Sequence, residues 1–427
     1  MESRKPLQYC TAEAFTANPR LASRRSLILG IVSSGFTSVL FSSERALSEI
    51  SRLVGGSSGS SVKFLDDATS TAWINFEMPD YRRVILPARI NGRAVKVLLD
   101  SGIGSLILDG SLAEDLGLKK LGNVNGVGVT GIAQGQLVEG VTLSLDNLSI
   151  GTSKSELYDM TPFAGLLSEP IAALIGRDLF DSLIVDIDFA NTRIAFRDPG
   201  STVAPPHAFH LPLQQDRFGL RSVPISLEGR PPIQATLDLG SDRPLSVAPQ
   251  YAASQNLLSN RKTSTTLSAG VAGNQEGRIA VLSKLTLGSA LFSQVPFQVP
   301  KTWTFENQAI LGLPVIRRTR MVIDFTHDRI SVLPNQTAMS QSFRKDRSGL
   351  GAKRLKDRLQ VMHVAKDSPA AAAGIHIGDE IIAINDQPLD ADYFKEHPRD
   401  GSQPAGTVFY FTLSTHERIK LTLADYY

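Results

Sequence analysis

The sequence predicts a mainly β protein that consists of two homologous lobes followed by a smaller third domain. Three observations lead to this prediction: a chain of 427 residues, a set of landmarks that occurs twice in the same order, and a change of composition after Pro334. The length leaves room for about two to four domains. Most of both copies consists of short apolar and β-branched runs between Gly, Pro, Asn and Asp turns, which is typical of strands. Helical patterns are few, at Ser111–Leu116 and Pro249–Leu257.

Composition narrows the possible classes of protein. The chain is 42% hydrophobic and 20% charged, which indicates a globular protein with a substantial core. Its 44 Lys+Arg and 42 Asp+Glu give a net charge of +2, so we expect no nucleic-acid partner. Cys10 is the only cysteine, which excludes an intramolecular disulfide framework and a multi-cysteine metal site. We expect no metal and no organic cofactor.

Residues 1–48 have the features of an export leader. Arg24 and Arg25 precede a mildly apolar stretch, Leu27–Phe41, which is shorter than the roughly 20 residues that span a bilayer. The paired arginines resemble the twin-arginine export motif. An ordinary signal peptide and an organelle-targeting leader remain as alternatives. We therefore expect an exported protein of the periplasm or cell envelope without a stable transmembrane anchor. Residues 49–80 are expected to form a linker, rich in Gly and Ser, and an N-terminal extension.

The first landmarks of the repeat end on an Asp-x-Gly tripeptide. In the first copy, Ile90–Arg93 contains an Asn-Gly turn, and Val97–Gly102 ends on Asp-Ser-Gly. In the second copy, Leu227–Arg230 contains a Glu-Gly turn, and Ala235–Gly240 ends on Asp-Leu-Gly. Each copy therefore predicts a hairpin whose second strand carries an aspartate, Asp100 or Asp238, at its end.

The later landmarks keep almost the same spacing. Leu174–Gly176 and Ile310–Gly312 are both apolar-apolar-Gly segments, and their glycines lie 76 and 74 residues after Asp100 and Asp238. An Asp-Phe pair and an Arg-Ile pair follow in both copies: Asp188-Phe189 with Arg193-Ile194, and Asp324-Phe325 with Arg329-Ile330. We infer two homologous β lobes, residues 81–199 and 210–334, which together form a pseudo-dimer.

Two aspartates at the ends of buried strands suggest a specific chemistry. If the lobe interface brings Asp100 and Asp238 together, the two carboxyl groups cannot both be ionised comfortably and will share a proton. The ionised member can then act as a general base on water while the protonated member polarises a carbonyl group. This is the chemistry of an aspartic endopeptidase.

Both copies resemble the retropepsin-like and pepsin-like aspartic peptidases, and the first resembles the exported bacterial type. The resemblance covers residues 81–334 and implies catalytic roles for Asp100 and Asp238. It implies an apolar-apolar-Gly segment under each aspartate and a glycine-rich flap over the cleft. The resemblance also implies that four residues support the dyad: Ser101, Gly102, Gly240 and Ser241. It assigns Gly128, Thr130 and Gly131 to the flap, and Ala269–Gly273 to the counterpart of the flap in the second lobe.

One residue departs from the family pattern. The family places Thr or Ser after each catalytic Asp, and this hydroxyl braces the two loops across the interface. Ser101 has that hydroxyl, whereas Leu239 does not. Three explanations are open. Either Ser241 substitutes for the missing hydroxyl, or the second loop is held by packing alone, or the site has lost its activity. The alternative function is therefore a catalytically degenerate envelope protein that binds peptides without cleaving them.

Residues 343–427 resemble a PDZ domain. Asp367–Ile375 contains a Ser-Pro-Ala helix start, and Gly378–Asp386 contains a Gly-Asp-x-Ile-x-x-Ile-Asn segment. PDZ domains bind an extended peptide as an added strand and hold its terminal carboxylate on backbone N–H groups. The resemblance assigns this loop to Gly349, Leu350, Gly351 and Ala352. Arg347 or Lys345 is expected to add positive charge there.

The expected partners follow from these two resemblances. They are a protein or peptide substrate in the cleft and a C-terminal peptide ligand on the PDZ domain. Ala352 stands where the family often has Phe, and Pro398 shortens the second helix, so a purely structural role for this domain stays open. We expect a monomer, because the two lobes already supply both aspartates.

Overall fold

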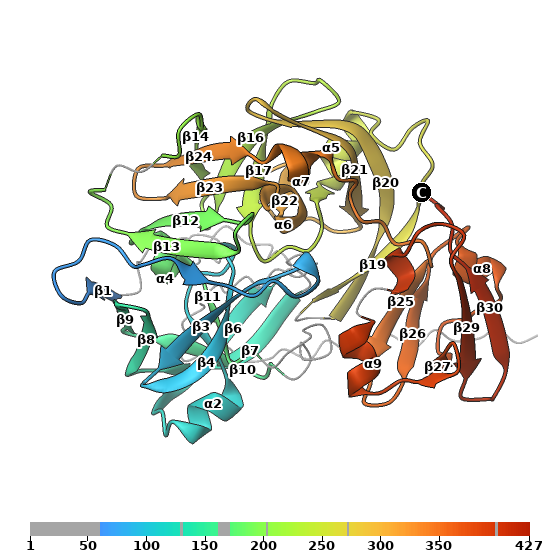
Figure 1. Ribbon diagram of the computed structural model, residues 1–427, viewed down its shortest axis with the longest axis horizontal. Helices are drawn as coiled ribbons and strands as arrows, with labels where there is room; N and C mark the ends of the chain where they lie inside the picture. The colour runs from blue at the N-terminus through green and yellow to red at the C-terminus, as the bar shows by residue number, and fades with distance from the viewer. Residues whose placement is uncertain (1–59, 129–130, 161–170, 202–203, 271–272, 398–399) are drawn as a thin grey trace, which may run out of the picture.

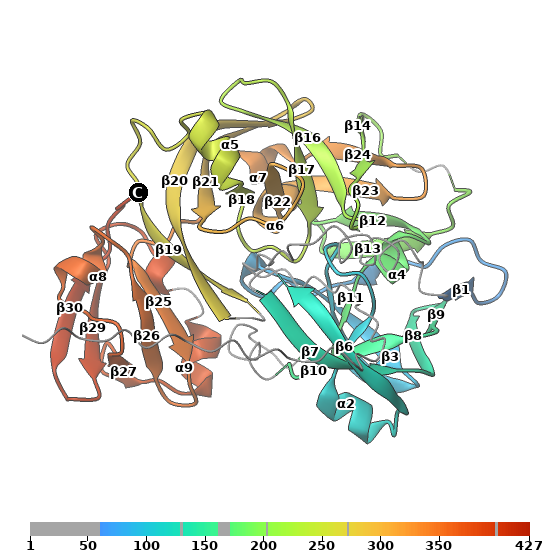
Figure 2. The same ribbon diagram turned by 180° about the vertical axis from the view of Figure 1, so that it is seen from behind.

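The computed structural model describes residues 60–128, 131–160, 171–201, 204–270, 273–397 and 400–427. The predicted leader and the tip of the predicted flap at Thr130 lie outside these ranges. Figures 1 and 2 show two β lobes side by side and a third β domain against the second lobe. The predicted mainly β architecture is confirmed. In the described ranges, none of the helices has the length and apolar composition needed to cross a membrane.

The first lobe is built on a ten-stranded sheet, counted over the described residues, with the order β1-β9-β8-β3-β4-β11-β5-β10-β7-β6. Its strands are β1 (Ser61–Phe64), β3 (Val84–Ile90), β4 (Arg93–Leu99), β5 (Ile107–Asp109), β6 (Lys120–Gly128), β7 (Gly131–Val138), β8 (Val141–Leu145), β9 (Leu148–Thr152), β10 (Ser155–Tyr158) and β11 (Ala173–Ile175). The turn between β3 and β4 is formed by Asn91 and Gly92, which both have positive φ. This is the turn that an Asn-Gly pair favours.

The second lobe repeats this plan in an eight-stranded sheet, again counted over the described residues. Its strands are β15 (Gln214–Gln215), β16 (Arg221–Leu227), β17 (Ile233–Asp238), β18 (Leu245–Val247), β19 (Ser264–Gly270), β20 (Gly273–Leu287), β21 (Ala290–Pro300) and β22 (Ala309–Gly312). Glu228 and Gly229 form the turn between β16 and β17, both with positive φ.

A third sheet joins the two lobes, in the order β14-β24-β23-β12-β13-β2. Its strands are β2 (Ile74–Asn75), β12 (Ile184–Asp188), β13 (Arg193–Arg197), β14 (Phe209–Pro212), β23 (Thr319–Asp324) and β24 (Arg329–Pro334). The repeated Asp-Phe and Arg-Ile landmarks form its two hairpins. In each hairpin the arginine Nε donates to the aspartate Oδ2, at 3.0 Å in both Arg193–Asp188 and Arg329–Asp324. These ion pairs therefore lie within the two hairpins, and the pairing of β12 with β23 joins one hairpin to the other.

The C-terminal domain has a sheet of its own, with β25-β26-β27-β29-β30 in order and β28 beside β27. Its strands are β25 (Leu350–Arg354), β26 (Leu359–Val364), β27 (Glu380–Ile384), β28 (Gln387–Pro388), β29 (Val408–Leu413) and β30 (Arg418–Thr422). Ser368 caps the helix that follows β26, because its side chain accepts from the N–H of Ala371.

The helices of the described residues are short. They are α2 (Gly110–Asp115), α4 (Arg177–Phe180), α5 (Pro249–Ser254), α6 (Leu313–Ile316), α7 (Gln336–Ser340), α8 (Pro369–Ala372) and α9 (Ala391–Glu396), with 3-10 turns at Pro79–Tyr81 and Asp400–Ser402. Helices α2 and α5 lie where the two helical patterns of the sequence predict them. Most buried apolar side chains of the two lobes form one core, a smaller separate cluster includes Ile85, Leu98 and Ile103, and the C-terminal domain has a core of its own.

Candidate active site

The two aspartates of the repeat lie at equivalent ends of equivalent strands. Strand β4 pairs in parallel with β11, and the N–H of Asp100 donates to the carbonyl of Ile175 at 2.9 Å. Strand β17 pairs in parallel with β22, which places Asp238 opposite Gly312. Both aspartates are buried, at 0% and 4% exposure. The apolar-apolar-Gly segments therefore support the two aspartate loops from below.

The glycine of each supporting segment is required by close backbone contact. A Cβ atom on Gly176 would lie 2.6 Å from the carbonyl oxygen of Ile103 and 2.7 Å from that of Asp100. A Cβ atom on Gly312 would lie 2.0 Å from the carbonyl oxygen of Arg243. Atoms cannot approach this closely without a backbone shift. The glycines allow each aspartate loop to fold directly onto the neighbouring strand.

The loops bring the two carboxyl groups together at Gly102. A Cβ atom placed on Gly102 would lie 3.2 Å from Oδ1 of Asp100 and 3.6 Å from Oδ1 of Asp238. Both carboxyl groups therefore lie beside Gly102, one from each lobe, and a side chain at this position would take space next to them.

Backbone N–H groups hold one oxygen of each carboxyl group. Oδ1 of Asp100 accepts from the N–H of Gly102 at 2.8 Å. Oδ1 of Asp238 accepts from the N–H groups of Gly240 at 2.9 Å and Ser241 at 3.0 Å. These bonds fix the orientation of the two carboxyl planes. Ser241 thus contributes to the site through its backbone.

A single hydroxyl joins the two loops. The hydroxyl of Ser101 donates to the carbonyl of Leu237 at 2.9 Å and accepts from the N–H of Leu239 at 3.1 Å. Leu239 itself is completely buried in the core of the lobes. Ser101 therefore braces the two loops from the first lobe, and the Leu239 side chain packs in the core beside them.

Two arginines and an aspartate beside the dyad were not identified from the sequence. Arg83 is 5% exposed. Its burial lowers the pKa of its guanidinium, and the carboxylates of Asp242, Asp100 and Asp238 oppose that shift. Arg82 forms an ion pair with Asp242 across the lobe interface. Burial alone would raise the pKa of Asp242, but the charges of Arg82, Arg83 and Arg243 together hold it far below its usual range.

The predicted flap is a long hairpin of strands β6 and β7. Gly128 pairs with Gly131 at the described end of this hairpin. Gly135 of β7 packs closely on β10, because a Cβ atom there would lie 2.7 Å from the ring of Tyr158. The second lobe carries an equivalent hairpin of β19 and β20, in which Gly270 pairs with Gly273. The roles of these glycines in covering a substrate stay predictions.

The loop assigned to peptide binding lies at the start of β25, in the C-terminal domain. Gly349 directly precedes β25, and Leu350, Gly351 and Ala352 begin this strand. Leu350 and Ala352 line the same cavity as Tyr393 and Phe394 of α9. Arg347 and Lys345, which were expected to add positive charge to this loop, both face Asp425. Nε of Arg347 lies 2.8 Å from Oδ1 of Asp425, and Nζ of Lys345 lies 3.8 Å from its Oδ2. Among the described residues, no cluster of His, Cys, Asp and Glu has the geometry to hold a metal ion.

Comparison with known families agrees with both resemblances. A family model described as aspartyl protease matches residues 86–179, and a family model described as PDZ domain matches residues 337–391. No curated protein matches the chain. The first match ends beside Gly176, so it covers Asp100 and its supporting segment but not Asp238. The chain therefore contains an aspartyl protease domain and a C-terminal PDZ domain.

Proposed function

We propose that this chain is an aspartic endopeptidase in which Asp100 and Asp238 activate a water molecule. The observation that best supports this proposal is that both carboxyl groups lie beside Gly102. We expect these two buried carboxyl groups to share a proton, because the doubly ionised state is disfavoured by repulsion and by desolvation.

The reaction needs both protonation states of the dyad. The ionised carboxylate takes a proton from water as the oxygen of that water bonds to the peptide carbonyl carbon. The protonated carboxyl group donates to the carbonyl oxygen, which gives a neutral tetrahedral diol. When the C–N bond breaks, the carboxyl group that is now protonated gives its proton to the leaving amine, and one hydroxyl of the diol gives its proton to the ionised carboxylate as the carbonyl group forms again as a carboxylic acid. Each cycle returns the dyad to its singly protonated state.

The surrounding charges support this state. The buried guanidinium of Arg83 lies in the electrostatic field of both aspartates, so it favours an ionised member of the pair. The N–H groups of Gly102, Gly240 and Ser241 act in the same direction. A dyad supported in this way is expected to be singly ionised, and most active, at acidic or mildly acidic pH.

A second function is favoured by one residue. Leu239 occupies the place of a hydroxyl that would brace the loops from the second lobe, so the site could bind peptides without cleaving them. The hydroxyl of Ser101 argues against this alternative, because it already bonds to both the carbonyl of Leu237 and the N–H of Leu239. The proposed peptidase therefore needs only one of the two hydroxyls.

The experiment that separates these functions is incubation of the mature protein with a randomised peptide library between pH 3 and pH 7. It is run with and without a transition-state analogue of aspartic peptidases. We expect cleavage that is strongest at the acidic end and that the analogue suppresses. Binding of library peptides without cleavage at any pH would instead assign the binding function. Export to the periplasm or cell envelope and a monomeric state remain part of the proposal.

A further inference from the structure

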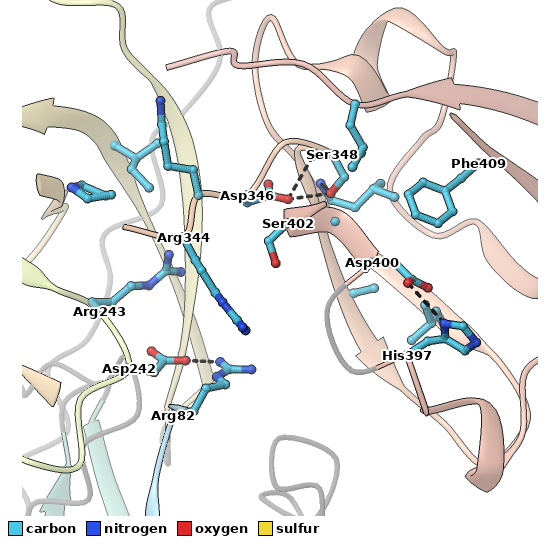
Figure 3. Close-up of a pocket in the computed structure, with 18 of the residues that line it drawn as sticks. Arg82, Asp242, Arg243, Arg344, Asp346, Ser348, His397, Asp400, Ser402 and Phe409 are labelled. Carbon is cyan, nitrogen blue, oxygen red and sulfur yellow. Dashed lines mark hydrogen bonds and ion pairs between the residues drawn. The ribbon is translucent and has the colours of Figure 1, made fainter. Parts of the chain in front are cut away.

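A cavity of about 470 Å³ lies between the PDZ domain and the second lobe (Figure 3). From the PDZ domain it is lined by β25 and α9, with Leu350, Ala352, Tyr393 and Phe394 among its walls. From the lobes it is lined by Arg82, Asp242, Arg243 and Pro244. The groove in which a PDZ domain places an added strand therefore opens onto residues that adjoin the catalytic loops.

The loop at the head of this groove already binds a carboxylate, and that carboxylate belongs to Asp346. Its Oδ1 accepts from the N–H of Ser348 at 3.0 Å and from the hydroxyl of Ser348 at 2.7 Å. Its Oδ2 accepts from the N–H of Gly349 at 2.9 Å and from the hydroxyl of Tyr426 at 2.7 Å. The hydroxyl of Ser348 also accepts from the N–H of Leu350 at 3.1 Å. Three successive N–H groups of the loop are thus bonded within the chain.

Charged residues of both signs line this end of the groove, and Arg344, Lys345 and Arg354 are the basic lining residues nearest to the loop in the chain. Asp346 and Asp400 both line the cavity, and Gly401 packs against Ser348, since a Cβ atom on Gly401 would lie 2.9 Å from the hydroxyl oxygen of Ser348. Arg347 is paired with Asp425. A peptide carboxylate brought to this loop would have to displace the carboxylate of Asp346 from the N–H groups of Ser348 and Gly349.

The side of the groove remains suited to an extended backbone. Within the described residues β25 pairs with β26 alone, so its other edge faces the cavity as an unpaired strand edge. The apolar residues Ile381, Ile384 and Phe411 line the same cavity and can receive side chains of a bound strand. An edge of this kind binds a strand through its backbone wherever that strand lies in its own chain.

The groove is held at a fixed position relative to the catalytic lobes. The PDZ domain contacts the β19–β20 hairpin through hydrogen bonds from Lys366 N–H to the hydroxyl of Thr265 at 3.1 Å and between that hydroxyl and His363 at 3.2 Å. Tyr426 and Tyr427 at the chain end pack with Ile279 of β20. The two domains are side by side in both Figure 1 and Figure 2.

We propose that the PDZ groove binds an internal extended segment of the same polypeptide that the peptidase cleft cuts, and that Asp346 occupies the place of a terminal carboxylate. The link to cleavage rests on the proposed peptidase function, whereas the choice of an internal segment does not. The groove then acts as a distant extension of the cleft at its Arg82–Asp242 end. Substrates are selected by length and extended conformation, and their C-termini need not be free.

The test compares two randomised dodecapeptide libraries that differ only in the C-terminus, one a free acid and the other an amide. Each is passed over the immobilised full-length mature protein carrying Asp100→Asn, and retained peptides are quantified by mass spectrometry. We expect both libraries to be retained equally, within about twofold. Recognition of a terminal carboxylate would weaken the amide library by about tenfold or more, and that result would overturn the proposal.

Two substitutions at neighbouring positions test whether the retained peptides are bound in the groove. Ala352→Trp fills the groove from the exposed strand β25, and we expect it to lower the retention of both libraries at least about fivefold. Lys353→Trp is the matched control, because consecutive strand residues point to opposite faces, and it should leave retention unchanged. Equal retention by both variants would overturn the proposal, as would retention of neither library by the parent protein. These readouts need no catalysis, so they are independent of whether the dyad cleaves peptides.

Discussion

The N–H of Leu239 in the second lobe donates to the hydroxyl of Ser101 in the first lobe at 3.1 Å. The same hydroxyl donates to the carbonyl of Leu237. All of these groups are buried, so one side chain satisfies a donor and an acceptor of the opposite aspartate loop. Removal of this hydroxyl is expected to disturb both the lobe interface and the dyad.

Ser101→Ala tests this brace. It leaves the N–H of Leu239 and the carbonyl of Leu237 without their buried partner, so we expect the free energy of unfolding to fall by about 1–3 kcal/mol. We also expect a lower kcat with little change in KM. Ser101→Thr keeps the hydroxyl and serves as the matched variant. Urea unfolding and peptide cleavage measure the two effects. Equal stability of Ser101→Ala and the parent protein would show that the hydroxyl braces nothing.

Asp242→Asn tests the charge cluster beside the dyad. The substitution removes the carboxylate that faces Arg82 and the buried Arg83, and we expect the free energy of unfolding at pH 7 to fall by about 3 kcal/mol. The folded protein lowers the pKa of Asp242, so this contribution is present above the ordinary value of 3.8 and is lost as the pH falls below it. The stability difference between variant and parent should therefore shrink below about pH 4. A difference that is constant from pH 7 to pH 2 would contradict the ion pair.

Glu156→Gln tests a buried carboxyl group behind the catalytic loop. Burial, assisted by the charge of Asp178, raises the pKa of Glu156 despite hydrogen bonds from Ser105 and Tyr158. A raised pKa means that the neutral form is favoured in the folded protein. The contribution to stability is complete below the ordinary value of 4.5 and is lost as the pH rises above it. Urea unfolding from pH 4 to pH 8 should therefore show a smaller decline for Glu156→Gln. An unchanged pH profile would place the group in a solvated environment.

Gly312→Ala tests the support beneath Asp238. The new methyl group would lie 2.0 Å from the carbonyl oxygen of Arg243, so we expect a loss of about 3 kcal/mol or failure to accumulate folded protein. Gly110→Ala is the matched control, because its methyl group would lie 3.9 Å from the carbonyl oxygen of Tyr158, which is an ordinary van der Waals contact. Thermal unfolding of both proteins gives the comparison. A Gly312→Ala protein as stable as the control would mean that the loop does not lie against this strand.

The main features of the fold could be predicted from the sequence because they are encoded locally and twice. The Asp-x-Gly tripeptides, the apolar-apolar-Gly segments and the Asn-Gly and Glu-Gly turns each have a short-range signal. The repeated pairs Asp188 with Arg193 and Asp324 with Arg329 could be recognised in the sequence. Their place in the sheet that joins the lobes could not be predicted, because that sheet depends on the pairing of β12 with β23, which come from different lobes.

The charge cluster at the site could not be predicted for a similar reason. Arg82 and Asp242 are 160 residues apart in the chain, and adjacent arginines at Arg82 and Arg83 are typical of a solvated surface. Asp346 precedes the loop that the PDZ resemblance assigns to peptide binding, and nothing local indicated that its carboxylate would bind the N–H groups of Ser348 and Gly349. In both cases the partners are set by the packing of whole domains.

The most direct test of the proposed peptidase is the rate of peptide cleavage at acidic pH by the parent protein, Asp100→Asn and Asp238→Asn. Each substitution keeps the size of the side chain but removes one carboxyl group from the dyad. We expect kcat/KM to fall by at least about 10³-fold in both variants, with unfolding transitions that remain cooperative. Cleavage that survives at the parent rate in either variant would contradict the two-aspartate mechanism.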